Sequence, residues 1–249
     1  AGTANTGSGG GGGGFDGGAT NYAGGAGGTG VIILRYALPS VTTPVLAAAS
    51  DTGASSSDGI TKTTGLTITG SAPVGATVQL KDGGTDTGSS CAAADTTGAW
   101  SCTTGTLAAG AHSITAVAST TLSASTATST SSALSVTVDT TAPTISSFSS
   151  STADGSYGIG QTINITATAS EAVQAGNTIT VTLDTGATVV LTAASAGTTL
   201  TGTYTIVAAQ NSSDLTVSSF AIGTVADTAG NSMTSTTVPT GTSNIAGAQ

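Results

Sequence analysis

Acidic side chains are the residues of this sequence best suited to chemistry, because the chain carries 12 Asp and Glu against 3 Lys and Arg. The acidic residues of interest, with one amide beside them, are Asp51 and Asp58 in ASDTGASSSDG, Asp139 in VTVDTTAP, Glu171 in ASEAV, and Asp227 with Asn231 in DTAGN. Carboxylates that gather without basic partners repel one another unless a hard cation neutralises them, and Ca²⁺ accepts about six to eight oxygen ligands. The alternative is that these are solvated turn residues, since Asp is a common turn former.

Residues for catalysis are scarce. The chain has one His (His112), one Glu and three cations (Arg35, Lys62 and Lys81), and no Ser-His-Asp arrangement can be argued around His112. A net charge of −9 excludes a nucleic-acid partner, because nothing would neutralise the phosphates. No run of about 18 apolar residues could span a membrane. We therefore expect a structural or binding protein and not an enzyme, with no nucleic acid and no membrane span.

Short segments with apolar or β-branched residues at every second position predict an all-β chain. They cover residues 66–70, 76–82, 111–119, 133–139, 163–169, 177–184, 187–194, 199–208, 214–223 and 232–238. Gly, Pro and Asp separate them about every ten residues, which is typical of β-sandwiches, and no helical period appears. The predicted organisation is a Gly-rich module (1–36), a linker (37–44), one sandwich domain (45–140) and a second sandwich domain (141–249).

The expected strand order would bring the acidic segments together at the joint between the two domains. ASDTGASSSDG follows the first strand of the first domain, and VTVD ends its last strand, so both segments lie at the bottom of that domain. In the second domain, Glu171 follows the second strand, and DTAGN forms the last turn at the top. The sequence therefore predicts an interdomain calcium site formed by Asp51, Asp58, Asp139, Glu171, Asp227 and Asn231.

Two cysteines flank the segment CAAADTTGAWSC. If residues 95–98 form a hairpin loop, Cys91 lies directly opposite Cys102, at the Cα separation of about 5.5 Å that a disulfide needs. The alternative is two free buried thiols. We expect the disulfide, as a structural staple without redox catalysis, because an acidic and Thr-rich chain of this kind is typical of exported proteins.

The glycine-rich start of the chain allows two interpretations, a flexible linker or an ordered segment. Glycine loses more backbone entropy on ordering than any other residue, so an ordered run requires close packing of backbones. We expect the ordered form. The following strand, Val31, Ile32, Ile33, Leu34 and Tyr36, is too apolar for an exposed edge, so we expect it to dock onto a sheet in its own domain or a neighbour's.

The few aromatic residues are expected to serve packing. Trp100 follows the predicted hairpin turn and is interpreted as a core anchor, in preference to a carbohydrate platform. Tyr157 and Tyr204 are interpreted as core or corner residues for the same reason.

Several segments are familiar. ASDTGASSSDGITKTTGLTITGSAPVGATVQLKDGG, ADTTGAWSCTTGTLAAGAHSITAVA and SSALSVTVDTTAP resemble the bacterial Ig-like repeats of surface adhesins and biofilm proteins, over residues 45–143. Residues 142–240 look like a related Ig/cadherin-like repeat, with DGSYGIGQTINITATASEAV and VADTAGN. The N-terminal stretch GSGGGGGGFDGGATNYAGGAGGTGVIILRY is similar to the glycine-rich modules of bacterial surface proteins and phage tail adhesins.

The resemblance implies two tandem immunoglobulin-like sandwiches after the Gly-rich segment, with roles in stalks and adhesion and often with calcium stiffening the joints. Such repeats carry an Asp-x-x-Gly-Asn loop, which Asp227, Gly230 and Asn231 match. The corresponding stretch of the first domain, ASTTLSASTATS (118–129), has no acid. We therefore expect calcium only at the joint between the two sandwiches, and none between the Gly-rich module and the first.

The leading functional hypothesis is a secreted, non-enzymatic structural protein that assembles with copies of itself into a cell-surface filament or layer. The alternative is a fragment of an adhesin or tail-fibre stalk that binds a surface receptor or carbohydrate. Calcium is the only cofactor expected.

Overall fold

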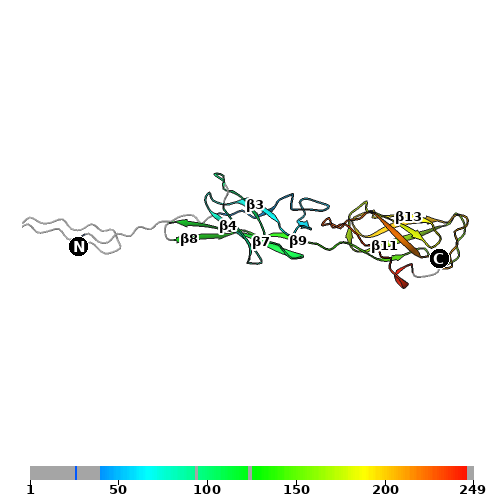
Figure 1. Ribbon diagram of the computed structural model, residues 1–249. Helices are drawn as coiled ribbons and strands as arrows, with labels where there is room; N and C mark the ends of the chain where they lie inside the picture. The colour runs from blue at the N-terminus through cyan, green and yellow to red at the C-terminus, as the bar shows by residue number, and fades with distance from the viewer. Residues whose placement is uncertain (1–25, 27–39, 93–94, 123–124, 246–249) are drawn as a thin grey trace, which may run out of the picture. The chain divides into compact units, whose positions relative to one another are not determined.

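The structure, a computed structural model, describes residue 26 and residues 40–92, 95–122 and 125–245 (Figure 1). The Gly-rich module and the assembly strand, Val31, Ile32, Ile33, Leu34 and Tyr36, lie outside the described residues. The all-β prediction is confirmed, because the elements of the described chain are strands except for η1 (Gly241–Ser243), one short 3₁₀ turn. The described strands all belong to one compact unit, Pro39–Gln249, and form two successive sandwiches.

The first sandwich has two sheets that face each other. Its strands are β1 (Val45–Leu46), β2 (Ile60–Thr61), β3 (Thr67–Ser71), β4 (Thr77–Asp82), β5 (Thr85–Ala92), β6 (Ala99–Thr103), β7 (Gly110–Leu122), β8 (Ser125–Thr130) and β9 (Leu134–Val138). One sheet has the order β1-β3-β6 and the other β2-β9-β7-β4-β5, with β8 paired to the far part of β7. All pairs are antiparallel except β2 with β9. The first two strands therefore lie at the edges of different sheets, β1 in the three-stranded sheet and β2 in the other.

Alternation along the strands builds the core of the first sandwich. In β4, Val78 and Leu80 are fully buried, while the residues between and beside them face outward. In β6 the same period buries Trp100 and Cys102. Trp100 is 2% exposed and packs over Gly70, where a Cβ atom would lie 2.5 Å from the indole Cζ2. The core-anchor interpretation of Trp100 is confirmed by its burial.

The second sandwich consists of β10 (Ile145–Ser149), β11 (Thr162–Val173), β12 (Thr178–Leu183), β13 (Thr188–Thr192), β14 (Gly197–Thr205) and β15 (Val217–Thr224). Their order is β10-β11-β14-β13-β12-β15, and β13 pairs with β14 at Thr192 and Thr201. Figure 1 shows β11 and β13 in this sandwich. The strands bury every second residue, and Phe148 and Phe220 meet edge to face, with ring centroids 5.8 Å apart.

The C-terminal segment closes the other side of the second sandwich. The side-chain amide of Asn244 donates to the carbonyl oxygen of Val217 at 2.9 Å and accepts from its N–H at 2.9 Å. The next N–H, of Ile245, donates to the carbonyl oxygen of Phe148. Val217 begins β15 and Phe148 lies in β10, so this segment joins the two terminal strands of the six-stranded sheet.

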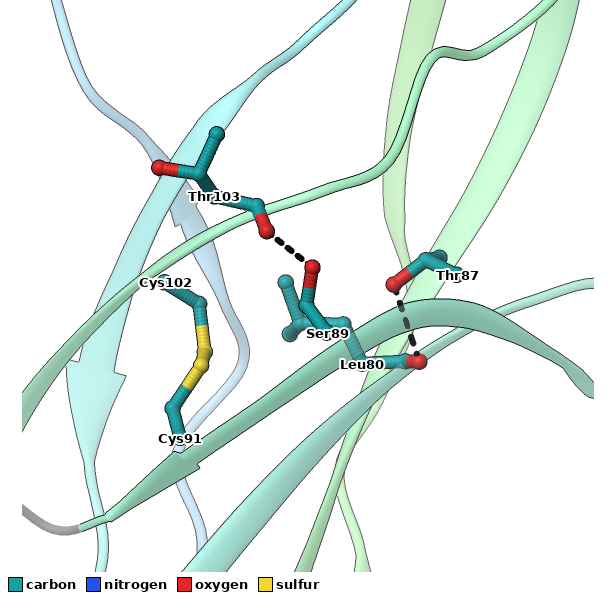
Figure 2. Close-up of a disulfide and its surroundings, with 6 residues drawn as sticks. All are labelled: Leu80, Thr87, Ser89, Cys91, Cys102 and Thr103. Carbon is teal, nitrogen blue, oxygen red and sulfur yellow. Dashed lines mark hydrogen bonds between the residues drawn. A yellow bond between two sulfur atoms is a disulfide. The ribbon is translucent and has the colours of Figure 1, made fainter.

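The disulfide is present, but its setting differs from the predicted hairpin. Cys91 and Cys102 have Cα atoms 5.7 Å apart, and their strands β5 and β6 belong to different sheets. Each cysteine has a neighbour in its own ladder, Val78 for Cys91 and Ile68 for Cys102. Figure 2 shows the bond crossing between the two strands. The disulfide therefore joins the edge strands of two sheets. The hairpin prediction had placed both cysteines in one ladder.

Hydrogen bonds near the disulfide also connect β5 to β6 and to the segment that follows β6. The Ser89 hydroxyl donates to the carbonyl oxygen of Thr103 (Figure 2). The N–H of Gly105 donates to the carbonyl oxygen of Thr87 at 2.9 Å. The expected turn at residues 95–98 forms, with the Gly98 N–H donating to the Asp95 carbonyl. The sequence prediction of the pairing is correct because the turn fixes how far apart the two cysteines lie.

Two strand predictions need correction. Residues 232–238 do not form a strand, because only Ser232 makes a bridge, with Ala226, and the segment then continues without a ladder. The Ser/Thr tract that follows β7 was not predicted as a strand but contains β8, which pairs with residues 117–122.

Reduction of the disulfide is expected to destabilise the first sandwich by about 3 kcal/mol, because the bond closes a loop of about 12 residues in the unfolded chain. Trp100 is the single tryptophan and is buried in this sandwich, so its fluorescence reports the unfolding of this part of the chain. Chemical denaturation with and without a reductant measures the difference. A Cys91→Ala/Cys102→Ala variant should unfold like the reduced protein and ignore the reductant, and equal stability of all forms would contradict the prediction.

Candidate metal centre

Three carboxylates meet where the two sandwiches join. Asp139 directly follows β9, Glu171 lies near the end of β11, and Asp227 begins the turn after β15. One carboxylate oxygen of each lies within 4.8 Å of those of the other two. Asp227 is 1% exposed, whereas Asp139 and Glu171 are half-buried. Three separate chain segments thus contribute to one group of acids.

The turn that holds Asp227 is shaped by its own carboxylate. The Asn231 N–H donates to Asp227 Oδ1 at 2.8 Å, and Asn231 Nδ2 donates to Asp227 Oδ2 at 2.8 Å. Gly230 takes a φ of +93°, a conformation that glycine adopts readily. Asn231 Nδ2 also donates to the carbonyl oxygen of Asp139 at 2.8 Å, and this hydrogen bond connects the turn to the end of the first sandwich. Asn231 therefore lies beside both aspartates.

The electrostatics of this group are unfavourable without a cation. Burial, and then the negative charges of Asp139 and Asp227, raise the pKa of Glu171 above its usual value. Within the described chain the ion pairs are Lys81 with Asp86 and His112 with Asp82, and neither involves this group. The three carboxylates supply oxygen atoms, the ligand type that Ca²⁺ prefers, whereas Asn231 turns its NH₂ group toward the two aspartates.

Two of the six predicted ligands lie apart from this group. Asp51 is 5% exposed, and its Oδ2 accepts from the N–H of Gly59 at 3.1 Å. Asp58 is exposed, and its Oδ1 accepts from the N–H of Ile60 at 3.0 Å. Both carboxylates order the loop from which they come. The structure brings together Asp139, Glu171, Asp227 and Asn231, and does not bring Asp51 and Asp58 to them.

The loop that carries Asp51 and Asp58 instead touches the Asp227 turn directly. The Thr52 hydroxyl donates to the carbonyl oxygen of Ala229 at 3.0 Å, and the Ala54 N–H donates to that of Thr228 at 3.1 Å. Lys62 Nζ donates to the carbonyl oxygen of Gly230 at 2.7 Å. Sequence reasoning missed these contacts, since hydroxyl and backbone groups carry no pattern that marks a partner far away in the chain.

Gly53 lies at the centre of this contact. Its φ is +106°, and a Cβ atom on it would lie 2.1 Å from the carbonyl oxygen of Thr228. The two backbones approach each other more closely than any side chain permits. One glycine in the sequence ASDTG was the available signal for this close approach, but glycine is too frequent in this chain to single it out.

The other candidate residues have local partners. His112 Nδ1 lies 2.7 Å from Asp82 Oδ2, and its Nε2 lies 2.9 Å from the carbonyl oxygen of Ala108. Burial alone would lower the pKa of His112, but these hydrogen bonds and the charge of Asp82 raise it. His112 therefore ties β7 to the end of β4.

Comparison with known proteins identifies the first sandwich. Residues 38–140 match the family model of the bacterial Ig-like domain. The match covers both sheets of the first sandwich and ends just after Asp139. A search of curated proteins gave no match.

The Ig-like domain indicates a structural role of the surface or adhesin type, since domains of this family are typically non-catalytic. The disulfide fits an extracellular protein, because such bonds persist in oxidising environments. Among the described residues, no helix has the length and hydrophobicity needed to cross a membrane.

Replacing Gly53 with alanine is expected to separate the loop from the Asp227 turn, because the new methyl group would overlap the Thr228 carbonyl. Hydrogen exchange should then accelerate at the Ala54 amide, and the chain should lose about 1–3 kcal/mol of stability. Gly75→Ala is the matched control, since Gly75 has a φ of +77° with nothing within 4 Å of an added Cβ. The same exchange pattern in both variants would show that backbone strain, and not the contact, is responsible.

Proposed function

We propose that the chain is a non-enzymatic extracellular structural protein, a subunit that assembles with copies of itself into a cell-surface filament or layer. Calcium bound by Asp139, Glu171, Asp227 and Asn231 stiffens the junction between its two sandwiches. The observation that supports this most directly is the group of three carboxylates at that junction, beside a dense set of hydrogen bonds between the sandwiches.

The hydrogen bonds and the carboxylates have opposite effects on the junction. Contacts from Thr52, Ala54 and Lys62 hold the Asp227 turn against the Ig-like domain. Repulsion among Asp139, Glu171 and Asp227 opposes the same arrangement. A divalent cation removes the repulsion and adds ligand bonds to both sandwiches at once, which makes the junction's rigidity depend on the extracellular calcium concentration.

The residues present suit Ca²⁺ better than softer metals. The candidate ligand atoms that lie together are carboxylate oxygens of Asp139, Glu171 and Asp227, and neither cysteine nor histidine belongs to the group. Oxygen ligands select hard cations, and Ca²⁺ tolerates irregular geometry more readily than Mg²⁺.

Calcium is expected to raise the thermal midpoint of the second sandwich relative to EGTA. Extracellular calcium modules bind with dissociation constants of about 10⁻⁴–10⁻³ M, so about 10 mM calcium would contribute about 1.4–2.7 kcal/mol, or several degrees. Glu171→Gln should reverse the order of stabilities. In EGTA the variant should be the more stable protein, since a charge that is repelled is removed, and in calcium it should be the less stable one. Differential scanning calorimetry measures both.

Asp58→Asn is the matched control for this experiment. Asp58 is an exposed acid that does not belong to the carboxylate group, and an asparagine there can still accept from the Ile60 N–H. The control should show the full calcium shift of the wild type. Midpoints that do not change between calcium and EGTA would refute the calcium site while leaving the structural role intact.

Self-assembly is supported by the apolar segment 31–36 and by the character of the described strands. The outward residues of the strands are largely Ser and Thr, so copies can approach without strong charge repulsion. Among the described strands, β8 pairs with β7 alone and is therefore an edge strand. Such an edge accepts an added strand. We infer that segment 31–36 of one copy docks on a sheet edge of the next.

Negative-stain electron microscopy is expected to show filaments or layers of the purified protein in calcium, and fewer or none in EGTA. Deleting residues 31–36 should abolish assembly because the docking strand is lost. Ile159→Ser is a suitable control, since Ile159 is an apolar residue, 73% exposed, outside that segment. Full assembly by the deletion variant would refute the docking role of the segment.

A further inference from the structure

The second sandwich has a cavity at the end away from the carboxylate group. Its volume is about 650 Å³, within the range of small-molecule sites. Three segments line it: the loop between β10 and β11, the turn between β12 and β13, and the loop between β14 and β15. Ile163 at this end of β11 and Glu171 near the other end are eight residues apart, which corresponds to roughly 26 Å of strand. The cavity is therefore separate from the candidate metal centre.

The floor of the cavity is apolar and the rim is polar. Ile163, Ile206 and Leu215 form the floor and are at most 8% exposed. Tyr204, 4% exposed, and the half-buried Tyr157 add two aromatic rings. The sequence predicted both tyrosines as core or corner residues. Tyr204 is a core residue, and the structure places both in the lining of one cavity.

Hydrogen bonds hold the walls in place before any ligand binds. The Tyr204 hydroxyl donates to Gln210 Oε1 at 3.0 Å, and the Val207 N–H donates to the same oxygen at 3.2 Å. Tyr157 donates to the carbonyl oxygen of Ala153. On the other wall, Asp184 Oδ1 accepts from the Thr216 N–H at 3.2 Å. A preformed site loses less conformational entropy on binding.

The polar groups of the rim favour hydroxyl groups as ligands. Asp154, Asn211 and Ser213 line the cavity, together with the Gln210 amide, whose oxygen is already used by the Tyr204 hydroxyl and the Val207 N–H. Carboxylates accept hydrogen bonds from hydroxyls, and amides both accept from them and donate to them. None of the residues that line the cavity is Lys, Arg or His, and an acid is among them. Anionic ligands are therefore disfavoured, and the polar rim disfavours a purely apolar one.

We propose that this cavity binds a neutral saccharide. Sugar rings combine an apolar C–H face, which packs on the negative face of an aromatic ring, with hydroxyls around the edge. Tyr157 supplies the aromatic surface, the buried Tyr204 supports it from the core, and Asp154, Gln210 and Asn211 supply the partners for hydroxyls. The inference goes beyond the structural role proposed above, depends on neither calcium nor assembly, and gives the chain a ligand-binding function of the adhesin type.

The test uses the full chain and a panel of neutral mono- and oligosaccharides built from glucose, galactose, mannose and N-acetylglucosamine, with sialylated and sulfated counterparts. An array followed by isothermal titration calorimetry is expected to give saturable binding to a subset of the neutral sugars, equal in calcium and in EGTA. Failure of binding at about 10 mM sugar, a range in which even millimolar affinities would saturate the site, would overturn the proposal. Preferential binding of the sialylated or sulfated sugars would also overturn it.

Variants locate the binding within the molecule. Asp154→Asn and Asn211→Ala are each expected to weaken binding about tenfold, which is about 1.4 kcal/mol. Tyr157→Leu should do the same by removing the ring, whereas Tyr157→Phe should retain most of the affinity. Asp214→Asn is the matched control for Asp154→Asn, because Asp214 is an exposed acid of the β14–β15 loop that does not line the cavity. Binding that is insensitive to all the cavity variants, or equally sensitive to the control, would refute the assignment.

Discussion

The buried carboxylate of Asp227 is the constraint on which the junction of the two sandwiches depends. Its two oxygens accept from Asn231 and so fix the turn that offers three successive carbonyl groups to the Ig-like domain. The same charge is held beside Asp139 and Glu171. The residue that shapes the contact therefore also creates the repulsion within it. Removing this carboxylate would relieve the repulsion but also release the turn, so one side chain is responsible for both effects.

A chain with 3% aromatic residues and small side chains needs other ways to close its sandwiches. In the Ig-like domain the disulfide joins the edge strands β5 and β6 of the two sheets. In the second sandwich Asn244 and Ile245 join β10 to β15 with backbone and amide hydrogen bonds. A covalent bond in one sandwich and hydrogen bonds in the other thus both connect strands at the edges of the sheets, the strands through which separate chains could otherwise pair.

Local patterns in the sequence predicted what local forces determine. Alternation in β11 predicted a strand there because Ile163 and Ile165 must face the core, and the turn before Gly98 predicted the distance between the cysteines. The carboxylate group was predicted in part, for residues at strand ends whose direction the fold fixes. Asp51 is not part of the three-carboxylate group, and its carboxylate accepts from the Gly59 N–H of its own loop. The Ser/Thr alternation of β8 carries no apolar signal, so only pairing with β7 reveals the strand.

Basic side chains are few in this chain, and their positions affect how the junction is stabilised. Lys81 pairs with Asp86 at an exposed site, where an ion pair contributes little. Lys62 uses its ammonium group on a backbone carbonyl of the Asp227 turn, and His112 is committed to Asp82. Each of these described cations is thus engaged away from the three junction carboxylates. The negative charge there is relieved either by a proton on Glu171, whose pKa is raised, or by the calcium ion proposed above, which would enter from solution.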